Sequence, residues 1–79
     1  MYYLYILRSE QKNWKYIGIT DNLTKRLQEH NAGKTKSTKP YRPFVIIYTE
    51  KFESKTEARV REIFLKKNFK AREEIYKGL

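Results

Sequence analysis

Apolar and aromatic residues follow one another almost without interruption at the start of the chain, in the segment Tyr2–Arg8, which reads YYLYILR. A run of aromatic and branched side chains predicts a well-buried β-strand. The polar segment SEQKN then predicts a turn into a second strand, WKYIGIT, so the two strands form a hairpin. A third run, FVIIYTEKF, predicts another strand over about Phe44–Lys51.

A helix is predicted between the second and third strands. Leu23, Leu27 and His30 recur at spacings of four and three, which puts them along one stripe of a helix. Asp21 or Asn22 can cap its first turn. Gly33 predicts its end, because glycine readily adopts the left-handed conformation that follows many helices.

A second helix is predicted after the third strand. Ser54 and Glu57 in SKTE form a capping-box pattern, and the helix continues to about Lys67. A short terminal helix is predicted in KAREEIYKGL. On the helical wheel Glu62 lies at the edge of an apolar face, whose other predicted members are Ala58, Leu65 and Phe69, extended on the other side by Val60 and Phe64.

These elements, in the order β-β-α-β-α, predict an α+β fold. Helices would cover a small three-stranded antiparallel sheet, because the hairpin favours antiparallel pairing. The 79 residues predict one domain, residues 1–79. Such an architecture implies no function by itself.

Composition narrows the class of protein. There is no cysteine, which excludes disulfides and thiolate metal sites. No apolar run approaches the roughly 20 residues of a membrane span, and the N-terminus MYYLYILRSE lacks the basic start and cleavage site of an export signal. We therefore expect a cytoplasmic protein with no membrane partner.

Basic residues dominate the charge of the chain. Eighteen Lys and Arg stand against nine Asp and Glu, a formal net charge of +9, which attracts a polyanion such as nucleic acid. The alternative is an ordinary lysine-rich surface. Clustering favours a binding role, because GKTKSTKPYRP carries no acid and predicts a flexible loop that binds phosphates. Its basic residues are Lys34, Lys36, Lys39 and Arg42, interleaved with the neutral donors Thr35, Ser37, Thr38 and Tyr41.

Two tyrosines in the hairpin introduce the candidate chemistry. Tyr5 and Tyr16 lie on neighbouring strands, and alternation lets both point to the same face of the sheet. Tyr16 begins the string YIG, and LTKRLQEHNAGK and TEARVREIFLKK follow in order. In these segments the chain resembles the GIY-YIG nuclease superfamily, and most of all its small stand-alone bacterial members.

The resemblance implies a metal-dependent endonuclease that hydrolyses phosphodiester bonds in DNA, with DNA repair among the roles of the superfamily. It implies one divalent ion, Mg²⁺ or Mn²⁺, held by Glu62 together with water and phosphate oxygens. The catalytic residues that it implies are Tyr5, Tyr16, Arg26, His30 and Glu62.

The residue types suit that chemistry. Arg26 can hydrogen-bond two phosphoryl oxygens at once. A tyrosine is a weak base at its free pKa near 10, so either tyrosine needs a neighbour that helps it, and the sequence leaves open which of the two takes the proton. His30, one helical turn after Arg26, can relay a proton or position the water.

Each residue also has an ordinary structural role. Strand tyrosines pack, a histidine near a helix end interacts with the helix dipole, an exposed helical arginine is solvated, and Glu62 can pair with Lys66 at i+4. These roles must together explain the order and spacing of all five residues. That coincidence favours the functional interpretation.

Some positions differ from the superfamily pattern. Tyr3 stands where the family name has its first glycine, Ile19 follows YIG where some members have lysine, and Glu74 stands where several larger members have asparagine. These differences motivate an alternative, a non-catalytic basic nucleic-acid-binding module with a degenerate site. A third alternative is a protein-interaction domain. We also expect that a protein partner supplies specificity, and the sequence leaves DNA and RNA undistinguished.

Overall fold

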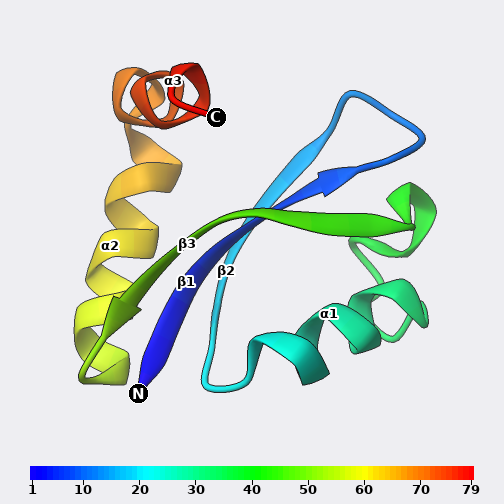
Figure 1. Ribbon diagram of the computed structural model, residues 1–79, viewed down its shortest axis with the longest axis horizontal. Helices are drawn as coiled ribbons and strands as arrows, with labels where there is room; N and C mark the ends of the chain where they lie inside the picture. The colour runs from blue at the N-terminus through cyan, green and yellow to red at the C-terminus, as the bar shows by residue number, and fades with distance from the viewer.

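The computed structural model describes residues 1–79 as a three-stranded sheet with three α-helices (Figure 1). The predicted order of elements and the α+β class are confirmed, including the short terminal helix. The strands are β1 (Tyr2–Ser9), β2 (Lys15–Thr20) and β3 (Phe44–Phe52). The helices are α1 (Leu23–Asn31), α2 (Lys55–Lys67) and α3 (Phe69–Lys77), and a 3₁₀ turn, η1 (Lys39–Tyr41), precedes β3.

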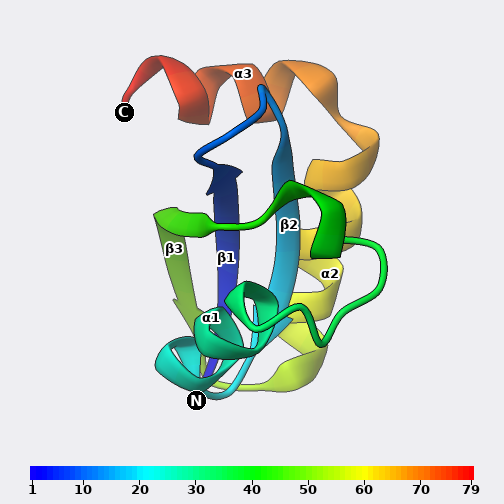
Figure 2. The same ribbon diagram turned by 90° about the vertical axis from the view of Figure 1, so that its right-hand side faces the viewer.

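The first strand is the centre of the sheet. The strand order is β2-β1-β3, and both pairings are antiparallel. A register shift between Ile6 and Leu7 marks an irregularity in the pairing with β3. The two views show α1 on one face of the sheet and α2 on the other, with α3 across the end at which the β1–β2 hairpin turns (Figures 1 and 2).

Because β1 is covered on both faces, its side chains build two small cores. Leu4 and Ile6 pack with Ile17 and with Leu65 of α2. The alternate side chains of β1 face α1, where the buried residues are Tyr5, Leu7 and Phe44. This explains why the start of the chain is apolar without the polar alternation of a half-exposed strand.

Helix α1 begins and ends by the predicted signals. Of the two candidate caps, Asn22 is used, and its side-chain oxygen accepts from the Lys25 amide at 3.1 Å. Gly33, with φ of 78°, follows the helix end. Leu23 and Leu27 pack against the core that contains Tyr5, so the predicted stripe faces the sheet.

Helix α2 begins after Ser54, whose hydroxyl accepts from the Glu57 amide at 3.2 Å, as the capping pattern predicts. Ala58, Glu62 and Leu65 form its buried stripe. The prediction that Val60 and Phe64 extend the buried face is wrong, because these side chains are 63% and 45% exposed.

The reason for this error is rotational: at about 100° per residue, Val60 and Phe64 project from the side of the helix opposite to Ala58 and Leu65. Phe69 is also wrongly placed in the core, since it is 65% exposed. Asn68 is extended, ends α2 and caps α3, so Phe69 belongs to a new helix with a different rotation. No helix of the structure is both long and apolar enough to cross a membrane.

Candidate functional site

The two tyrosines predicted to share a face do so, next to a glycine that makes room for one of them. Tyr5 lies opposite Gly18 in the β1–β2 pairing, and Leu7 lies opposite Tyr16. The two tyrosine rings are 6.3 Å apart. A Cβ atom on Gly18 would lie 2.6 Å from the Tyr5 hydroxyl oxygen, which is too close for any real contact. The glycine of YIG therefore creates the space that the Tyr5 side chain fills.

Helix α1 brings Arg26 and His30 to this tyrosine pair. The two residues are four positions apart and project from one side of the helix. His30 Nε2 lies 2.9 Å from the Tyr5 hydroxyl, and Arg26 Nε donates to the same oxygen at 3.4 Å. The ring of Tyr16 lies 5.2 Å from that of His30. Four of the five predicted site residues thus form one contiguous cluster.

Sequence reasoning missed the role of Thr38, which continues this cluster into the basic loop. Its hydroxyl oxygen lies 2.9 Å from His30 Nδ1, and the hydroxyl donates to the Thr35 carbonyl oxygen at 3.3 Å. Thr38 is fully buried, so its predicted role as a phosphate donor is wrong. No local pattern distinguishes it from Ser37, because the distinction arises only when the loop folds against α1.

These contacts define the direction of a hydrogen-bond chain. The Thr38 hydroxyl has given its proton to Thr35, so it can only accept from His30 Nδ1–H. In that tautomer Nε2 carries no proton and accepts from the Tyr5 hydroxyl. Tyr5 in turn accepts from Arg26. Every buried side-chain polar atom of the structure has a hydrogen-bond partner.

Burial shifts the protonation equilibria of this chain. Burial, together with the nearby Arg26 charge, lowers the pKa of His30 to about 4, because the imidazolium would lie in a dry environment beside another cation. Burial also raises the pKa of Tyr5 to about 12, although the Arg26 hydrogen bond acts in the opposite direction. At neutral pH both groups are uncharged, as the hydrogen-bond directions require.

Arg26 is the part of the cluster that reaches solvent. Its side chain is 32% exposed and also forms an ion pair with Glu29 at 3.1 Å. Tyr16 is half-buried, whereas Tyr5 is 1% exposed and His30 is 0% exposed. The site therefore has an accessible part, which contains Arg26 and Tyr16, and a buried part behind it.

Glu62 of α2 is linked to this site through Lys66. The carboxylate is only 5% exposed, and its two oxygens bind Arg59 at 3.0 Å and Lys66 at 3.1 Å. Lys66 Nζ also lies 5.8 Å from the centre of the Tyr16 ring. The ion pair with Lys66 that sequence analysis gave as the ordinary role of Glu62 is thus present.

The acidic side chains around the site offer few ligands to a divalent ion. No group of three or more His, Cys, Asp or Glu side chains lies close enough together to hold a metal. Glu62 can offer a hard cation a single carboxylate, and its two oxygens are paired with Arg59 and Lys66, whose side chains are 56% and 49% exposed. Substrate phosphate and water would have to supply the remaining ligands.

The sequence predicted a flexible phosphate-binding loop, and the structure shows that part of this loop packs against the rest of the domain. Thr38 of the loop is buried, and the Tyr41 ring stacks on Trp14 with centroids 4.0 Å apart. Its four basic side chains are exposed and form no ion pair and no hydrogen bond with the five predicted catalytic residues; they are Lys34, Lys36, Lys39 and Arg42.

The site has the residues expected of a GIY-YIG domain: a pair of hairpin tyrosines, an arginine and a histidine from α1, and a buried glutamate from α2. The model of the GIY-YIG catalytic domain matches residues 1–76, and the chain belongs to this nuclease-type family. Among curated proteins, the chain is similar to small bacterial UPF0213 proteins. It is 37% identical to the UPF0213 protein YazA of Bacillus subtilis over 76 residues, covering 95% of this chain and 76% of the relative.

Two further comparisons agree. The chain is 46% identical over 66 residues to the UPF0213 protein SH2523 of Staphylococcus haemolyticus, covering 82% of this chain and 79% of that protein. The solution NMR structure of the UPF0213 protein BH0048 from Bacillus halodurans superposes with a TM-score of 0.58 at 31% identity. That match covers 98% of this chain and 84% of the other. The fold and the family are therefore shared with these proteins.

Proposed function

We propose that this protein is a metal-dependent endonuclease that hydrolyses phosphodiester bonds in DNA. The observation that carries the proposal is the Tyr5 hydroxyl, held between His30 Nε2 at 2.9 Å and Arg26 Nε at 3.4 Å. A buried chain of this kind fixes the Arg26 guanidinium at the surface of the site. Membership of the GIY-YIG catalytic-domain family supports the reaction class.

The accessible residues would contact the substrate. Arg26 donates only one of its N–H groups to Tyr5 and one to Glu29, so further N–H groups remain for a phosphoryl group. As negative charge grows on the phosphoryl oxygens, a guanidinium held in advance stabilises it without reorganisation. Of the two tyrosines, Tyr16 is the more exposed, so we propose Tyr16 as the one that contacts the attacking water.

Tyr5 and His30 are proposed to position rather than to touch the substrate. Both are buried, so a proton from water can reach His30 only through the Tyr5 hydroxyl. With a pKa of about 4, His30 is a poor base in the free protein. A phosphate bound to Arg26 would offset the positive charge that disfavours the imidazolium, and so make His30 more basic when substrate is present.

Glu62 is the residue proposed to hold one Mg²⁺ or Mn²⁺ ion. When bound, such an ion polarises the phosphoryl group and relieves charge on the leaving oxygen. The chain would contribute a buried carboxylate that is linked to Tyr16 through Lys66, and Arg59 and Lys66 would pair with the substrate backbone when the ion binds. A single protein carboxylate predicts weak ion binding without substrate.

The decisive experiment is cleavage of a panel of branched, flap and single-stranded DNA, and of matched RNA, with and without Mg²⁺ or Mn²⁺. Wild type should cleave only with metal, and Glu62→Gln should abolish cleavage while its circular dichroism spectrum and melting temperature stay close to wild type. Glu53→Gln, which removes an exposed carboxylate, serves as the control and should cleave normally. If wild type leaves the whole panel intact, the protein is not a nuclease.

One observation favours a second candidate, a non-catalytic nucleic-acid-binding module. Both oxygens of Glu62 are occupied by cationic side chains, and the structure supplies no second carboxylate for a metal. This candidate predicts salt-dependent binding that survives the double substitution Arg26→Ala and Glu62→Ala, with no cleavage in any condition. Cleavage by wild type that both single substitutions remove would exclude it.

A further inference from the structure

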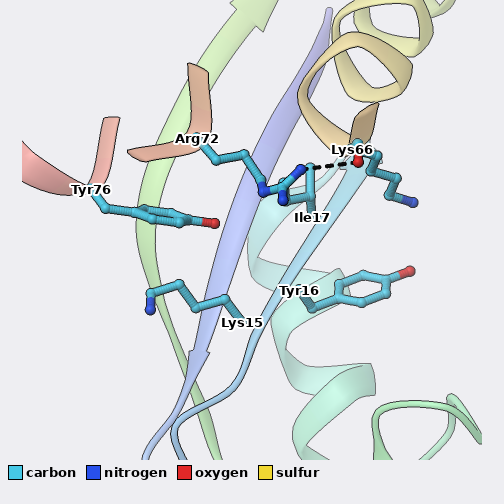
Figure 3. A pocket seen from close by; sticks show the side chains of 6 residues that line it. All are labelled: Lys15, Tyr16, Ile17, Lys66, Arg72 and Tyr76. Atoms are coloured by element: carbon cyan, nitrogen blue, oxygen red, sulfur yellow. Dashed lines mark hydrogen bonds between the residues drawn. The ribbon is translucent and has the colours of Figure 1, made fainter. Parts of the chain in front are cut away.

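A basic pocket lies beside the candidate site, between β2, the end of α2 and α3. It has a volume of about 270 Å³ and is lined by Lys15, Tyr16, Ile17, Lys66, Arg72 and Tyr76 (Figure 3). No carboxylate is among the lining residues. Neither Lys15 nor Arg72 forms an ion pair with any acidic side chain of the protein. Two cations thus converge on one hollow without a protein anion to balance them.

Arg72 is held rigidly in this pocket. One terminal nitrogen of its guanidinium donates to the carbonyl oxygens of Leu65 at 2.7 Å and Lys66 at 2.9 Å. These carbonyls belong to the last turn of α2, where backbone acceptors lack helical partners. Capping of α2 therefore uses only this one nitrogen of the Arg72 guanidinium. The other guanidinium N–H groups make no hydrogen bond, so they remain for an anion at little cost in side-chain entropy.

Lys15 and Tyr76 complete the pocket from the opposite side. Lys15 Nζ lies 4.8 Å from the centre of the Tyr76 ring, which holds the ammonium group at the rim. The Tyr76 hydroxyl points into the space between Lys15 and Arg72 (Figure 3). A fork of N–H groups, an ammonium and a hydroxyl facing one hollow are the donors that a phosphate group accepts.

The pocket shares two residues with the surroundings of the candidate site. Tyr16 lines the pocket and lies 6.3 Å from Tyr5, and Lys66 lines it while bonding to Glu62. The two sites therefore adjoin at the edge strand β2, with Lys15 and Ile17 on the α2 face and Tyr16 on the α1 face, and a single strand bound to Arg26 and Glu62 would reach the pocket by crossing that edge.

We propose that the pocket formed by Lys15, Arg72 and Tyr76 binds a phosphate of a single nucleic-acid strand, adjacent to the phosphate that is cleaved. The adjacency rests on the proposed nuclease function, whereas the phosphate site itself does not. The pocket would fix the register of the strand across the tyrosine site. It also gives α3 a role in substrate binding that is separate from the basic loop.

The experiment measures binding in EDTA, so that no cleavage is needed. Fluorescence anisotropy of a labelled thymidine hexanucleotide is recorded over a range of salt concentrations. Lys15→Met should weaken binding several-fold and lower the slope of log affinity against log salt by about 0.7, the value for one lost phosphate contact on a single strand. Lys51→Met, which removes one exposed charge from β3, is the matched control and should leave the slope unchanged. Equal effects of the two substitutions would overturn the proposal.

Arg72→Lys provides a second variant that keeps the charge but loses the fork, and it should weaken binding about as much as Lys15→Met. Unchanged binding by this folded variant would overturn the phosphate site. Thymidine 5′-monophosphate tests the source of the phosphate. If it binds the pocket as tightly as the hexanucleotide, by amide shifts at Lys15 and Tyr76, the site is one for free nucleotides and the strand assignment fails.

The outcome is independent of catalysis. If wild type never cleaves nucleic acid but Lys15→Met selectively weakens binding, the phosphate site stands and only its adjacency to a cleaved bond fails. If wild type does cleave, Lys15→Met should raise KM with kcat nearly unchanged, because a neighbouring phosphate contact acts equally on ground and transition states.

Discussion

Substitution of Gly18 by alanine tests how the sheet holds the Tyr5 side chain. The added Cβ would lie 2.6 Å from the Tyr5 hydroxyl oxygen, 2.7 Å from Cζ of the same ring and 3.0 Å from Cε2 of Tyr16. Ordinary carbon–oxygen contacts are about 3.3 Å or longer, so something must shift by roughly 0.7 Å. Tyr5 is buried and its hydroxyl is fixed by His30, so the shift must break that arrangement or bend the strand.

The expected loss of stability follows from three contributions. Overpacking of a buried site costs about 1–3 kcal/mol, and a strained or lost Tyr5–His30 hydrogen bond adds about 1 kcal/mol. Removing a glycine from a strand returns about 0.5–1 kcal/mol. We expect a net loss of about 1–3 kcal/mol, or roughly 5–20 °C in melting temperature. A displacement of this size should also lower any cleavage rate about a hundredfold.

Urea denaturation followed by circular dichroism measures the effect, and Tyr5→Leu isolates its cause. Leucine lacks the two Tyr5 atoms that the new Cβ would meet but leaves the 3.0 Å contact with Cε2 of Tyr16, so in that background Gly18→Ala should destabilise the protein much less than in wild type. Gly78→Ala is the control, since its Cβ would lie 3.5 Å from the Ile75 carbonyl oxygen, an ordinary contact. This substitution should change the free energy of unfolding little. Equal destabilisation by Gly18→Ala in both backgrounds would refute the reasoning.

Three further predictions concern the buried chain and the basic loop. The pKa of His30 falls to about 4 from its ordinary 6.5, so between these values the unfolded state binds more protons than the folded state. The free energy of unfolding should therefore be full above pH 6.5 and decline by about 3 kcal/mol toward pH 4. In urea titrations, His30→Gln should lack this part of the decline. Thr38→Val leaves His30 Nδ1–H without its acceptor and should cost about 1–3 kcal/mol, whereas Thr38→Ser should recover most of it. Replacing the four basic residues of the loop by alanine should weaken nucleic-acid binding and flatten its salt dependence, with the maximal rate unchanged. Unchanged affinity would show that the loop only connects its neighbours. The four residues are Lys34, Lys36, Lys39 and Arg42.

The fold was largely predictable because its signals are local. The aromatic run of β1, the Asn22 cap, the left-handed Gly33 and the Ser54 cap each act within a few residues, and each operates as the sequence indicates. The prediction failed at Val60 and Phe64 because they project from the side of α2 opposite to Ala58 and Leu65. An apolar side chain on an exposed helix face looks the same in sequence as one in the core.

The sequence predicted a group of residues of which four form one cluster in the structure, but it did not predict how these four are layered. Resemblance identified residues that the structure brings together, yet it could not show that His30 is sealed from solvent. The predicted contact of His30 with the reacting groups is therefore replaced in our proposal by a positioning role through the Tyr5 hydroxyl, because the imidazole is fully buried. Thr38 stayed hidden since its partner is eight residues away across a turn, a contact that no helix or strand period encodes.

The layering of the site explains why a small domain can hold an arginine precisely. A guanidinium on a nine-residue helix at the surface would ordinarily sample many rotamers. Here the Tyr5 oxygen restrains it, and that oxygen is itself restrained by a chain that ends on the backbone carbonyl of Thr35. Each member of the chain is neutral, so burial carries no penalty for an unpaired charge. The buried histidine thus contributes most by staying uncharged, because a protonated imidazole would place a second buried cation beside Arg26.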